Sequence, residues 1–414
     1  MESYDVLVAG AGPAGAATAI HLSRAGARVL LADKARFPRD KPCGGGLTGR
    51  ALRQIPVDPS PVVERDVDRF ELRLRYGSRF SREHDAPLIR MTQRRLLDAF
   101  LVEHAIAAGA ELRDGAKVET VELDGTGVTA RVAADTVRAD VLVGADGANG
   151  LVARAIEIDG QIVRGVALEG SVPLEALGHE ELERTAVIEL AVLPGGYGWV
   201  FPKGDHANLG VGGWGSEGQR LRDHLARLAR AHGVDPDAVT EVRGHRLPMR
   251  RLGTPAGSGR ALLVGDAAGL VDPLSGDGMY EAFVSARLAA EAILAGDLDG
   301  YTAAPVGRAR PPCRRVVGGE ARVRPLPAHR VRGGKGAEGL RGRRRPAVRG
   351  HGASRRRARG RARPAQAHRA PRGVKPRVTP PCGSVRRRGR APRSRRSGGS
   401  RGRSSRAFAL RSLA

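Results

Sequence analysis

The first 300 residues predict one large α/β unit with an inserted second domain. A glycine-rich turn, Gly10 to Gly15, lies near the N-terminus between an apolar strand pattern and a helix pattern. Two later apolar strand patterns each end in an aspartate beside a glycine, at Asp146-Gly147 and Gly265-Asp266. A segment of this length can also bury a sizeable core. Together these observations favour an α/β fold.

The charge of the chain changes abruptly near residue 300. Residues 1–300 hold 35 Lys and Arg against 42 Asp and Glu, whereas residues 301–414 hold 35 against 2. The net charge of +26 therefore comes from the C-terminal segment, where seven of the eighteen residues of Gly352–Arg369 are Arg. A composition step of this size marks a boundary.

The cysteine usage suits a reducing cytoplasm, and the hydropathy pattern gives no sign of a membrane span. Cys43, Cys313 and Cys382 form neither a disulfide framework nor a CxxC metal pair. No His, Cys and Asp cluster has metal-ligand spacing, so we expect no metal site. The N-terminus begins a strand at once, and no apolar run reaches about 18 residues. We expect a cytoplasmic protein without a signal peptide or a membrane span, and a peripheral membrane contact stays open.

The stretch YDVLVAGAGPAGAATAIHLSRAGARVLLADK predicts a strand, a tight turn, a helix and a second strand. In its G-x-G-x-x-G motif, Gly10 permits the turn, Gly12 lets the backbone approach a pyrophosphate, and Gly15 lets helix and strand pack closely. The helix N-terminus supplies N–H donors and a positive dipole end. Asp33 ends the second strand, where its carboxylate can accept both hydroxyls of a ribose. We favour nucleotide binding over a merely structural glycine turn.

A second G-x-G-x-x-G match, Gly210, Gly212 and Gly215, invites interpretation as a separate NAD(P) site. A helix pattern follows it, but no strand with a ribose-binding acid comes after that helix. We therefore favour a strand end that continues into a turn.

The later strand ends decide between FAD and NAD. The stretch RALLVGDAAGLVDPLSGDGMYEAF predicts a buried strand, then Gly265-Asp266, then a glycine-rich loop that opens a helix. Asp266 can hold ribitol hydroxyls, and the Pro273–Gly278 loop offers N–H groups to the electron-rich edge of a flavin. Asp146-Gly147 is a second pair of an aspartate and a glycine at the end of a predicted strand. Each pair alone could be a turn, but all three motifs in this order favour FAD.

With these motifs the chain resembles the FAD-dependent oxidoreductases of the p-hydroxybenzoate hydroxylase structural class, and within it the geranylgeranyl reductase family. The resemblance covers about Tyr4 to Ala304. Most of its motifs recur across the wider class, but KPCGGG (Lys41–Gly46) and YGWVFP (Tyr197–Pro202) resemble the prenyl reductase pattern. The chain departs from the family pattern at two places. Asp33 stands where Glu is common, and Asn149-Gly150 replaces the usual small residue and Ser after the Asp-Gly pair. Neither departure gives a reason to expect a loss of flavin binding.

The resemblance implies a discontinuous Rossmann-type FAD-binding domain with an inserted antiparallel-sheet substrate domain. The FAD-binding domain would comprise residues 1–66, 91–160 and 255–304, and the substrate domain residues 67–90 and 161–254. Arg94 would approach the FAD phosphates, with Asp98 in the same motif; a solvated helix face is the alternative for both. The cofactor-binding candidates are Gly10, Gly12, Gly15, Asp33, Gly44, Gly45, Arg94, Asp146, Gly147, Gly265, Asp266, Pro273, Gly276 and Gly278.

The chemistry that the resemblance implies is reduction of an isolated C=C bond by a hydride from flavin N5 and a proton. Such a site needs an apolar slot that excludes water. Tyr197, Trp199 and Phe201 would share one face of a strand and line that slot, unless they belong to a sheet core. Cys43 is the candidate proton donor or polarity setter, with an inert buried cysteine as the alternative.

The segment 305–414 is Arg-rich and of low complexity, without helical periodicity. Its composition suits either a disordered tail that binds nucleic acid through phosphate charge or an out-of-frame reading of a GC-rich gene. We favour the frameshift, because it explains the abrupt step, the charge and the lost periodicity together. We accordingly expect no specific nucleic-acid partner, and the activity of the chain stays in question.

The sequence thus predicts an FAD-dependent oxidoreductase that reduces prenyl double bonds on a small molecule or lipid. A flavin monooxygenase is the alternative enzyme, and a basic nucleic-acid-binding protein is the alternative of a different class. The prenyl substrate, the electron donor (NAD(P)H or ferredoxin) and the oligomeric state are left open.

Overall fold

The computed structural model describes residues 1–178 and 180–303, all of them within one compact unit that spans Met1–Pro327. The predicted tail over 305–414 lies outside the described residues. Its expected disorder, its reading frame and its nucleic-acid contacts therefore stay predictions. Within the described ranges, none of the helices is both long and apolar enough to cross a membrane.

A largely parallel sheet forms the first layer. Its strands run in the order β17 (Gly257–Ser258), β18 (Ala261–Leu263), β11 (Asp135–Gly144), β1 (Glu2–Ala9), β2 (Val29–Ala32) and β8 (Glu111–Arg113). The pairs β18–β11, β11–β1, β1–β2 and β2–β8 are parallel. The strands β9 (Val118–Leu123) and β10 (Val128–Val132) extend this sheet from β11 in antiparallel fashion. The α/β prediction is confirmed.

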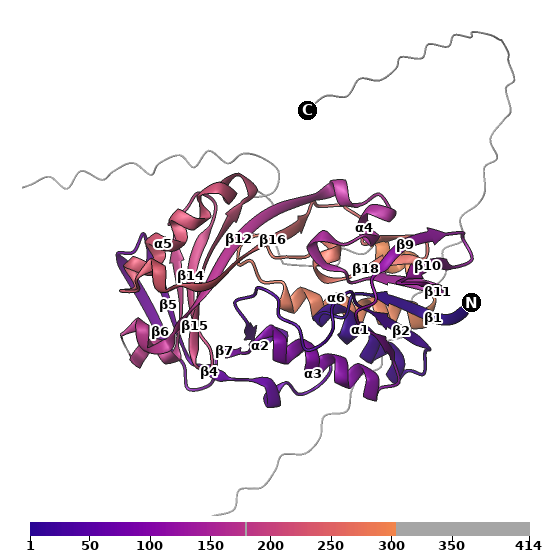
Figure 1. The fold of residues 1–414 in the computed structure, drawn as a ribbon, viewed down its shortest axis with the longest axis horizontal. Coiled ribbons are helices and arrows are strands. Elements are labelled where there is room, and N and C mark those ends of the chain that lie inside the picture. Colours follow the sequence, from indigo (N-terminus) through magenta and orange to yellow (C-terminus); the bar gives the residue numbers. More distant parts are fainter. Residues whose placement is uncertain (179, 304–414) are drawn as a thin grey trace, which may run out of the picture. The chain divides into compact units, whose positions relative to one another are not determined.

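Helices cover the parallel sheet and complete its core. The helix α1 (Pro13–Arg24) packs against α3 (Arg94–Ala107) and α6 (Met279–Ala295). Figure 1 shows these helices next to the strands β1 and β2. All four residues of β2 are buried, as is typical of a parallel strand with both faces covered. The shorter helices are α2 (Gly49–Leu52), α4 (Val152–Ala155) and α7 (Leu298–Ala303).

A second sheet contains seven strands in the order β16 (Thr240–Arg250), β12 (Ile162–Pro173), β15 (His206–Trp214), β14 (Tyr197–Pro202), β13 (Thr185–Leu190), β5 (Arg69–Leu74) and β6 (Ser78–Glu83). The helix α5 (Leu221–Ala231) packs on it through Leu221, Leu225 and Leu228. Every pair is antiparallel except β13–β5, which is parallel. The antiparallel prediction is wrong for that pair, because these two strands come from distant segments and no hairpin fixes their relative direction.

A three-stranded sheet lies where the chain passes between the two larger ones. It comprises β3 (Gly46–Thr48), β7 (Ile89–Met91) and β4 (Arg65–Val67). The predicted domain limits at 66/67 and 90/91 fall within β4 and β7, which pair with each other. Each predicted domain limit therefore divides one of two strands that are hydrogen-bonded to each other.

The second glycine motif has the structure that the sequence favoured. Gly210 and Gly212 lie inside β15, and Gly215 begins a 3-10 turn, η6 (Gly215–Arg220). The remaining 3-10 turns are η1 (Ser60–Val62), η2 (Gly147–Asn149), η3 (Asp159–Gln161), η4 (Leu174–Leu177), η5 (Glu180–Arg184), η7 (Pro236–Ala238) and η8 (Gly265–Ala268). The prediction of a strand end that continues into a turn is confirmed.

Candidate active site

A cavity of about 2840 Å³ is lined by residues of the parallel sheet and of the seven-stranded sheet. All of the predicted site residues line it except Gly15 and Gly265. A side chain on Gly15 would collide with the carbonyl group of Gly10, so Gly15 serves the packing of α1 on the turn. Gly265 is buried and donates its N–H to Ser285 Oγ at 3.0 Å.

The turn from β1 into α1 forms one end of the cavity. Gly10 has φ +106°, and a side chain there would press on the backbone of Ala145, so only glycine fits. Gly12 precedes α1 and no side chain caps this helix, so its first N–H groups are available to a ligand. Asp33, directly after β2, accepts the N–H groups of Ala11 at 2.7 Å and Ala35 at 2.8 Å.

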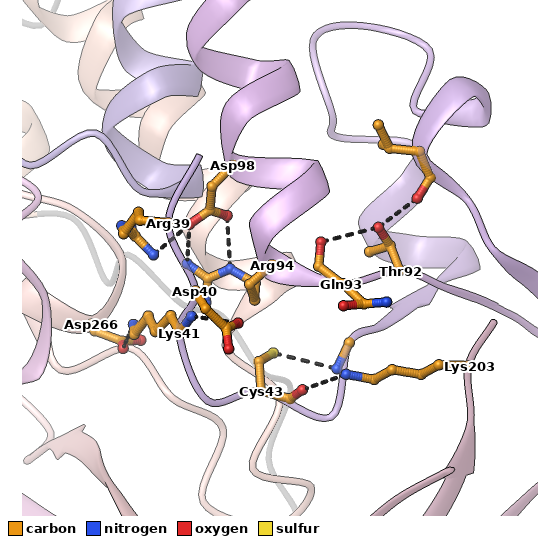
Figure 2. A network of polar contacts seen from close by, with 12 residues as sticks. Arg39, Asp40, Lys41, Cys43, Thr92, Gln93, Arg94, Asp98, Lys203 and Asp266 are labelled. Atoms are coloured by element: carbon orange, nitrogen blue, oxygen red, sulfur yellow. Dashed lines mark hydrogen bonds and ion pairs between the residues drawn. The ribbon is translucent and has the colours of Figure 1, made fainter. Parts of the chain in front are cut away.

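Two arginines lie beside this turn, and one buried aspartate holds both (Figure 2). Asp98, fully buried in α3, accepts two hydrogen bonds from Arg94 at 2.7 and 2.8 Å, and Arg39 lies 2.8 Å from the same carboxylate. A side chain on Gly12 would approach the guanidinium groups of Arg39 and Arg94 at 3.4 and 3.7 Å. The guanidinium groups therefore border the space beside the turn.

The electrostatics of this cluster favour a charged Arg94. Burial acts to lower the pKa of Arg94, but the neighbouring Asp98 outweighs it, so the pKa is raised above its ordinary value. The burial of both side chains excludes the solvated helix face as their role. Arg39 was missed in the sequence, because nothing local indicates that it meets a carboxylate on α3.

The two aspartates at later strand ends differ in their surroundings. Asp146 Oδ2 accepts the N–H groups of Leu151 at 2.5 Å and Val152 at 3.0 Å, whereas its buried Oδ1 has no hydrogen-bond partner among the described residues. Burial raises the pKa of Asp146. A polar ligand at this point would satisfy the free oxygen.

Asp266, in the turn η8 that follows β18, pairs with two basic groups. Lys41 Nζ lies 3.2 Å from its Oδ2, and His245 Nε2 lies 3.6 Å from the same oxygen. Burial acts to raise the pKa of Asp266, but Lys41 and His245 outweigh it and hold the pKa well below its ordinary value. Lys41 and His245 were not predicted as site residues, although Lys41 belongs to the KPCGGG motif.

The loop before α6 closes this part of the cavity. Pro273, Gly276 and Gly278 line it, and α6 begins directly after Gly278. Tyr197 donates its hydroxyl hydrogen to the carbonyl group of Ser275, which ties β14 to this loop. The predicted loop and the predicted aromatic strand are therefore in contact.

The Cys43 loop lies between the glycine turn and the aromatic strand. Gly45 has φ +78°, and a side chain there would overlap the carbonyl group of Thr92. A side chain on Gly44 would lie 3.0 Å from the ring of Phe201. Cys43, the one cysteine among the described residues, is free and half-buried, and its sulfur accepts the N–H of Gly45 at 3.4 Å.

Two charged side chains, one on β12 and one directly after β14, fix the Cys43 loop. Glu169 of β12 accepts the Cys43 N–H at 2.6 Å. Lys203 donates to the Cys43 carbonyl group at 3.1 Å, as Figure 2 shows. Burial raises the pKa of Glu169, against the influence of Lys203. Both residues were missed, because a single charge in a strand or turn carries no signal of a partner more than a hundred residues away.

The aromatic side chains of β14 form a row along the cavity. The ring centres of Tyr197 and Trp199 are 5.9 Å apart, and those of Trp199 and Phe201 are 6.4 Å apart. The Trp199 indole N–H donates to Asn208 Oδ1 at 2.7 Å, which fixes the middle ring. The prediction that the three rings share one face is confirmed.

The ionisation of Glu281, in the first turn of α6, makes stability depend on pH. Burial raises the pKa of Glu281 to about 7, from an ordinary 4.5. A raised folded-state pKa means that stability is highest below pH 4.5 and falls as pH rises to about 7, by about 3 kcal/mol for this group. Glu281→Gln should flatten this dependence in urea unfolding between pH 5 and 8, whereas Glu291→Gln, exposed on the same helix, should not. An unchanged pH profile in Glu281→Gln would show that the carboxyl group titrates normally.

The parallel sheet carries a glycine turn after β1, two arginines held by Asp98, and aspartates after several of its strands. These features define a dinucleotide-binding protein of the flavoprotein class. The family model for an FAD binding domain matches residues 3–295. The geranylgeranyl diphosphate reductase of Rhodobacter capsulatus is 31% identical, over 70% of this chain and 75% of that protein. The digeranylgeranylglycerophospholipid reductase 1 of Methanopyrus kandleri is 33% identical, over 70% and 80%.

Two further comparisons agree with these. The menaquinone reductase of Mycobacterium tuberculosis is 34% identical, over 72% of this chain and 78% of that protein. The crystal structure of a geranylgeranyl bacteriochlorophyll reductase-like protein from Thermoplasma acidophilum matches with a TM-score of 0.60 and 25% identity, over 72% of this chain and 80% of that one. The chain belongs to the geranylgeranyl reductase family of FAD-binding proteins.

Proposed function

We propose that this chain is an FAD-dependent oxidoreductase that reduces C=C bonds in the prenyl chain of a small molecule or lipid. One observation carries the proposal. The aromatic row of Tyr197, Trp199 and Phe201 and the Cys43 loop line the same cavity as the glycine turn. A dinucleotide and an apolar chain can therefore occupy one continuous space.

The described residues fit FAD. The space beside Gly12 is bordered by Arg39 and Arg94, which suits a pyrophosphate, and Asp33 lies where a ribose would follow. Asp146 offers a free buried oxygen, and Asp266 lies beside the loop before α6, toward which the flavin end would extend. Reduced FAD, when bound, supplies the hydride for one carbon of the double bond.

The protein residues would supply the apolar slot and the proton. The three aromatic rings would line an isoprenoid chain and exclude water. Cys43 would donate a proton to the second carbon, so that one hydride and one proton add across the bond. Glu169 is a positioning residue in this proposal, because it holds the backbone of Cys43 rather than its sulfur.

We further propose that the two larger sheets divide this work. Residues 1–66, 91–160 and 255–304 would bind FAD, and residues 67–90 and 161–254 would bind the prenyl chain. A prenylated lipid as substrate would require contact with a membrane surface.

Replacement of Cys43 tests the proton-donor role. Cys43→Ser should lower turnover about 100-fold, within the range for loss of a general acid, because the hydroxyl group is a much weaker acid. FAD binding should be unchanged, since serine is of similar size and the backbone of the Cys43 loop keeps its contacts with Glu169 and Lys203. Turnover under reducing conditions and the flavin content of the purified protein measure the two effects. Equal turnover in the variant would remove Cys43 from the mechanism.

Product analysis tests the function itself. The enzyme is reduced with dithionite and supplied with geranylgeranyl substrates, and the products are analysed by mass spectrometry. Addition of two hydrogen atoms for each reduced bond is the expected result. Incorporation of oxygen would instead favour the monooxygenase alternative.

A further inference from the structure

We propose that Asn208 and Gly210 of β15 are positioning residues that seat the Trp199 indole on the seven-stranded sheet and thereby keep open the space for a prenyl chain. The inference rests on the proposed function, because it takes the ligand to be such a chain. It also gives a role to Gly210, the first glycine of the second G-x-G-x-x-G motif. The slot is then shaped by residues that the ligand itself would not touch.

The Trp199 ring lies between Gly210 and the cavity. A side chain on Gly210 would overlap three carbon atoms of the six-membered ring of the indole, Cε2, Cζ2 and Cη2. Trp199 lines the cavity, whereas Gly210 is not among the described residues that line it. The strand register explains this position, because Trp199 of β14 is paired with Gly210 of β15, and paired residues project to the same face of a sheet. The indole thus covers the place where any other residue would put its side chain.

Asn208 fixes the orientation of the indole. Its Oδ1 accepts the Trp199 N–H at 2.7 Å, and its Nδ2 donates to the carbonyl group of Gly170 at 3.5 Å. An indole nitrogen can only donate, so the amide oxygen must point toward the ring. Asn208 is 3% exposed and Trp199 is 7% exposed. An apolar residue in place of Asn208 would therefore leave a buried N–H without its acceptor.

The same amide joins the ring to the Cys43 loop. Burial raises the pKa of Glu169, and Lys203 and a hydrogen bond from the Asn208 side chain act against it. Glu169 in turn accepts the N–H of Cys43 at 2.6 Å. On the side of the loop, a side chain on Gly44 would lie 3.7 Å from the indole nitrogen. Asn208 therefore links the position of the ring to the backbone of the candidate proton donor.

Gly212, two residues further along β15, provides a contrast on the same face of the strand. A side chain there would lie 3.5 Å from Ala167 Cβ and 3.6 Å from the Trp199 ring, which are ordinary van der Waals distances. Alanine at 212 would therefore fit without displacing the ring. Alanine at 210 would force the ring away from the strand and toward the cavity, into the space that the prenyl chain needs.

The test is a double-mutant cycle on the FAD-loaded, full-length protein. Titration calorimetry measures the Kd of geranylgeranyl diphosphate for the oxidised enzyme, after the flavin content of each variant has been matched by absorbance. Gly210→Ala should weaken binding about 10- to 100-fold, as expected when a methyl group is forced into a packed site. In the Trp199→Leu background the same substitution should change the Kd less than about 3-fold, because leucine lacks the three ring atoms that the methyl group meets.

Gly212→Ala is the matched control, with the same added methyl group on the same face of the same strand. It should leave the Kd nearly unchanged, because its contacts are ordinary ones. Equal effects of Gly210→Ala and Gly212→Ala would overturn the proposal. An effect of Gly210→Ala that persists in full beside Trp199→Leu would overturn it as well.

Asn208→Leu gives a second, independent binding test. Leucine is of similar size but cannot accept the indole N–H. Binding of geranylgeranyl diphosphate should weaken about 10-fold, within the range for a buried donor left without a partner. Equal binding by Asn208→Leu and the unchanged protein would remove Asn208 from the proposal.

Fluorescence tests the position of the ring without any ligand. The chain has two tryptophans, so Trp199 is observed alone in the Trp214→Phe background. Gly210→Ala and Asn208→Leu should each raise the acrylamide quenching constant, because each releases a ring that is otherwise buried. Unchanged quenching in both variants would show that β15 does not seat the ring. Raised quenching in a protein that binds no prenyl ligand would support the seating of the ring and contradict only the proposed function.

Discussion

Replacement of Arg94 with alanine should weaken FAD binding about 10- to 100-fold, the loss expected for hydrogen bonds to a charged group. The guanidinium group is buried, held by Asp98 and located beside Gly12. It is therefore pre-organised for a pyrophosphate and loses little freedom when one binds. Titration of the FAD-free protein with FAD, followed by flavin fluorescence, measures the effect.

The neighbouring residue supplies the control. Arg95 is exposed on the same turn of α3 and does not line the cavity, so Arg95→Ala should leave FAD affinity unchanged. Asp98 keeps its ion pair with Arg39 in the Arg94 variant, so the protein should still fold. If Arg94→Ala and Arg95→Ala bound FAD equally well, the pyrophosphate would have to lie elsewhere.

Replacement of Asp98 with alanine should have the largest effect on stability. It leaves the buried Arg94 without its partner and also releases Arg39. Removal of one partner from a buried ion pair typically destabilises a protein by about 3–5 kcal/mol. Urea unfolding of the variant at neutral pH should show a loss of this size, together with loss of FAD binding.

Glu103, exposed on the same helix, provides the comparison, since Glu103→Ala should change stability by less than about 0.5 kcal/mol. A small effect of Asp98→Ala would mean that water reaches Arg94 and takes the place of the carboxylate. We do not expect that outcome, because Asp98 is fully buried and water does not reach its carboxylate in the structure.

The parts of the site that the sequence predicts are those that local chemistry specifies. Gly10 must be glycine because its φ is +106°, and Asp33 comes directly after a fully buried strand. The row of Tyr197, Trp199 and Phe201 follows from the alternation of side chains along one strand. Each of these features depends on neighbours within a few residues.

The parts that the sequence does not predict depend on contacts between distant segments. Glu169 meets Cys43, 126 residues away, and Lys203 meets it from a distance of 160 residues. Likewise, the parallel direction of β5 and β13 has no local signal.

The most direct test of the central claim is an anaerobic single turnover of the purified protein. The bound flavin is reduced with one equivalent of dithionite, geranylgeranyl diphosphate is added without oxygen, and the flavin absorbance is recorded. The account predicts that the oxidised flavin spectrum returns, in proportion to the number of double bonds reduced. A flavin that stays reduced with this substrate, with geranylgeraniol and with the prenyl lipid, and is reoxidised only when oxygen is admitted, would contradict it.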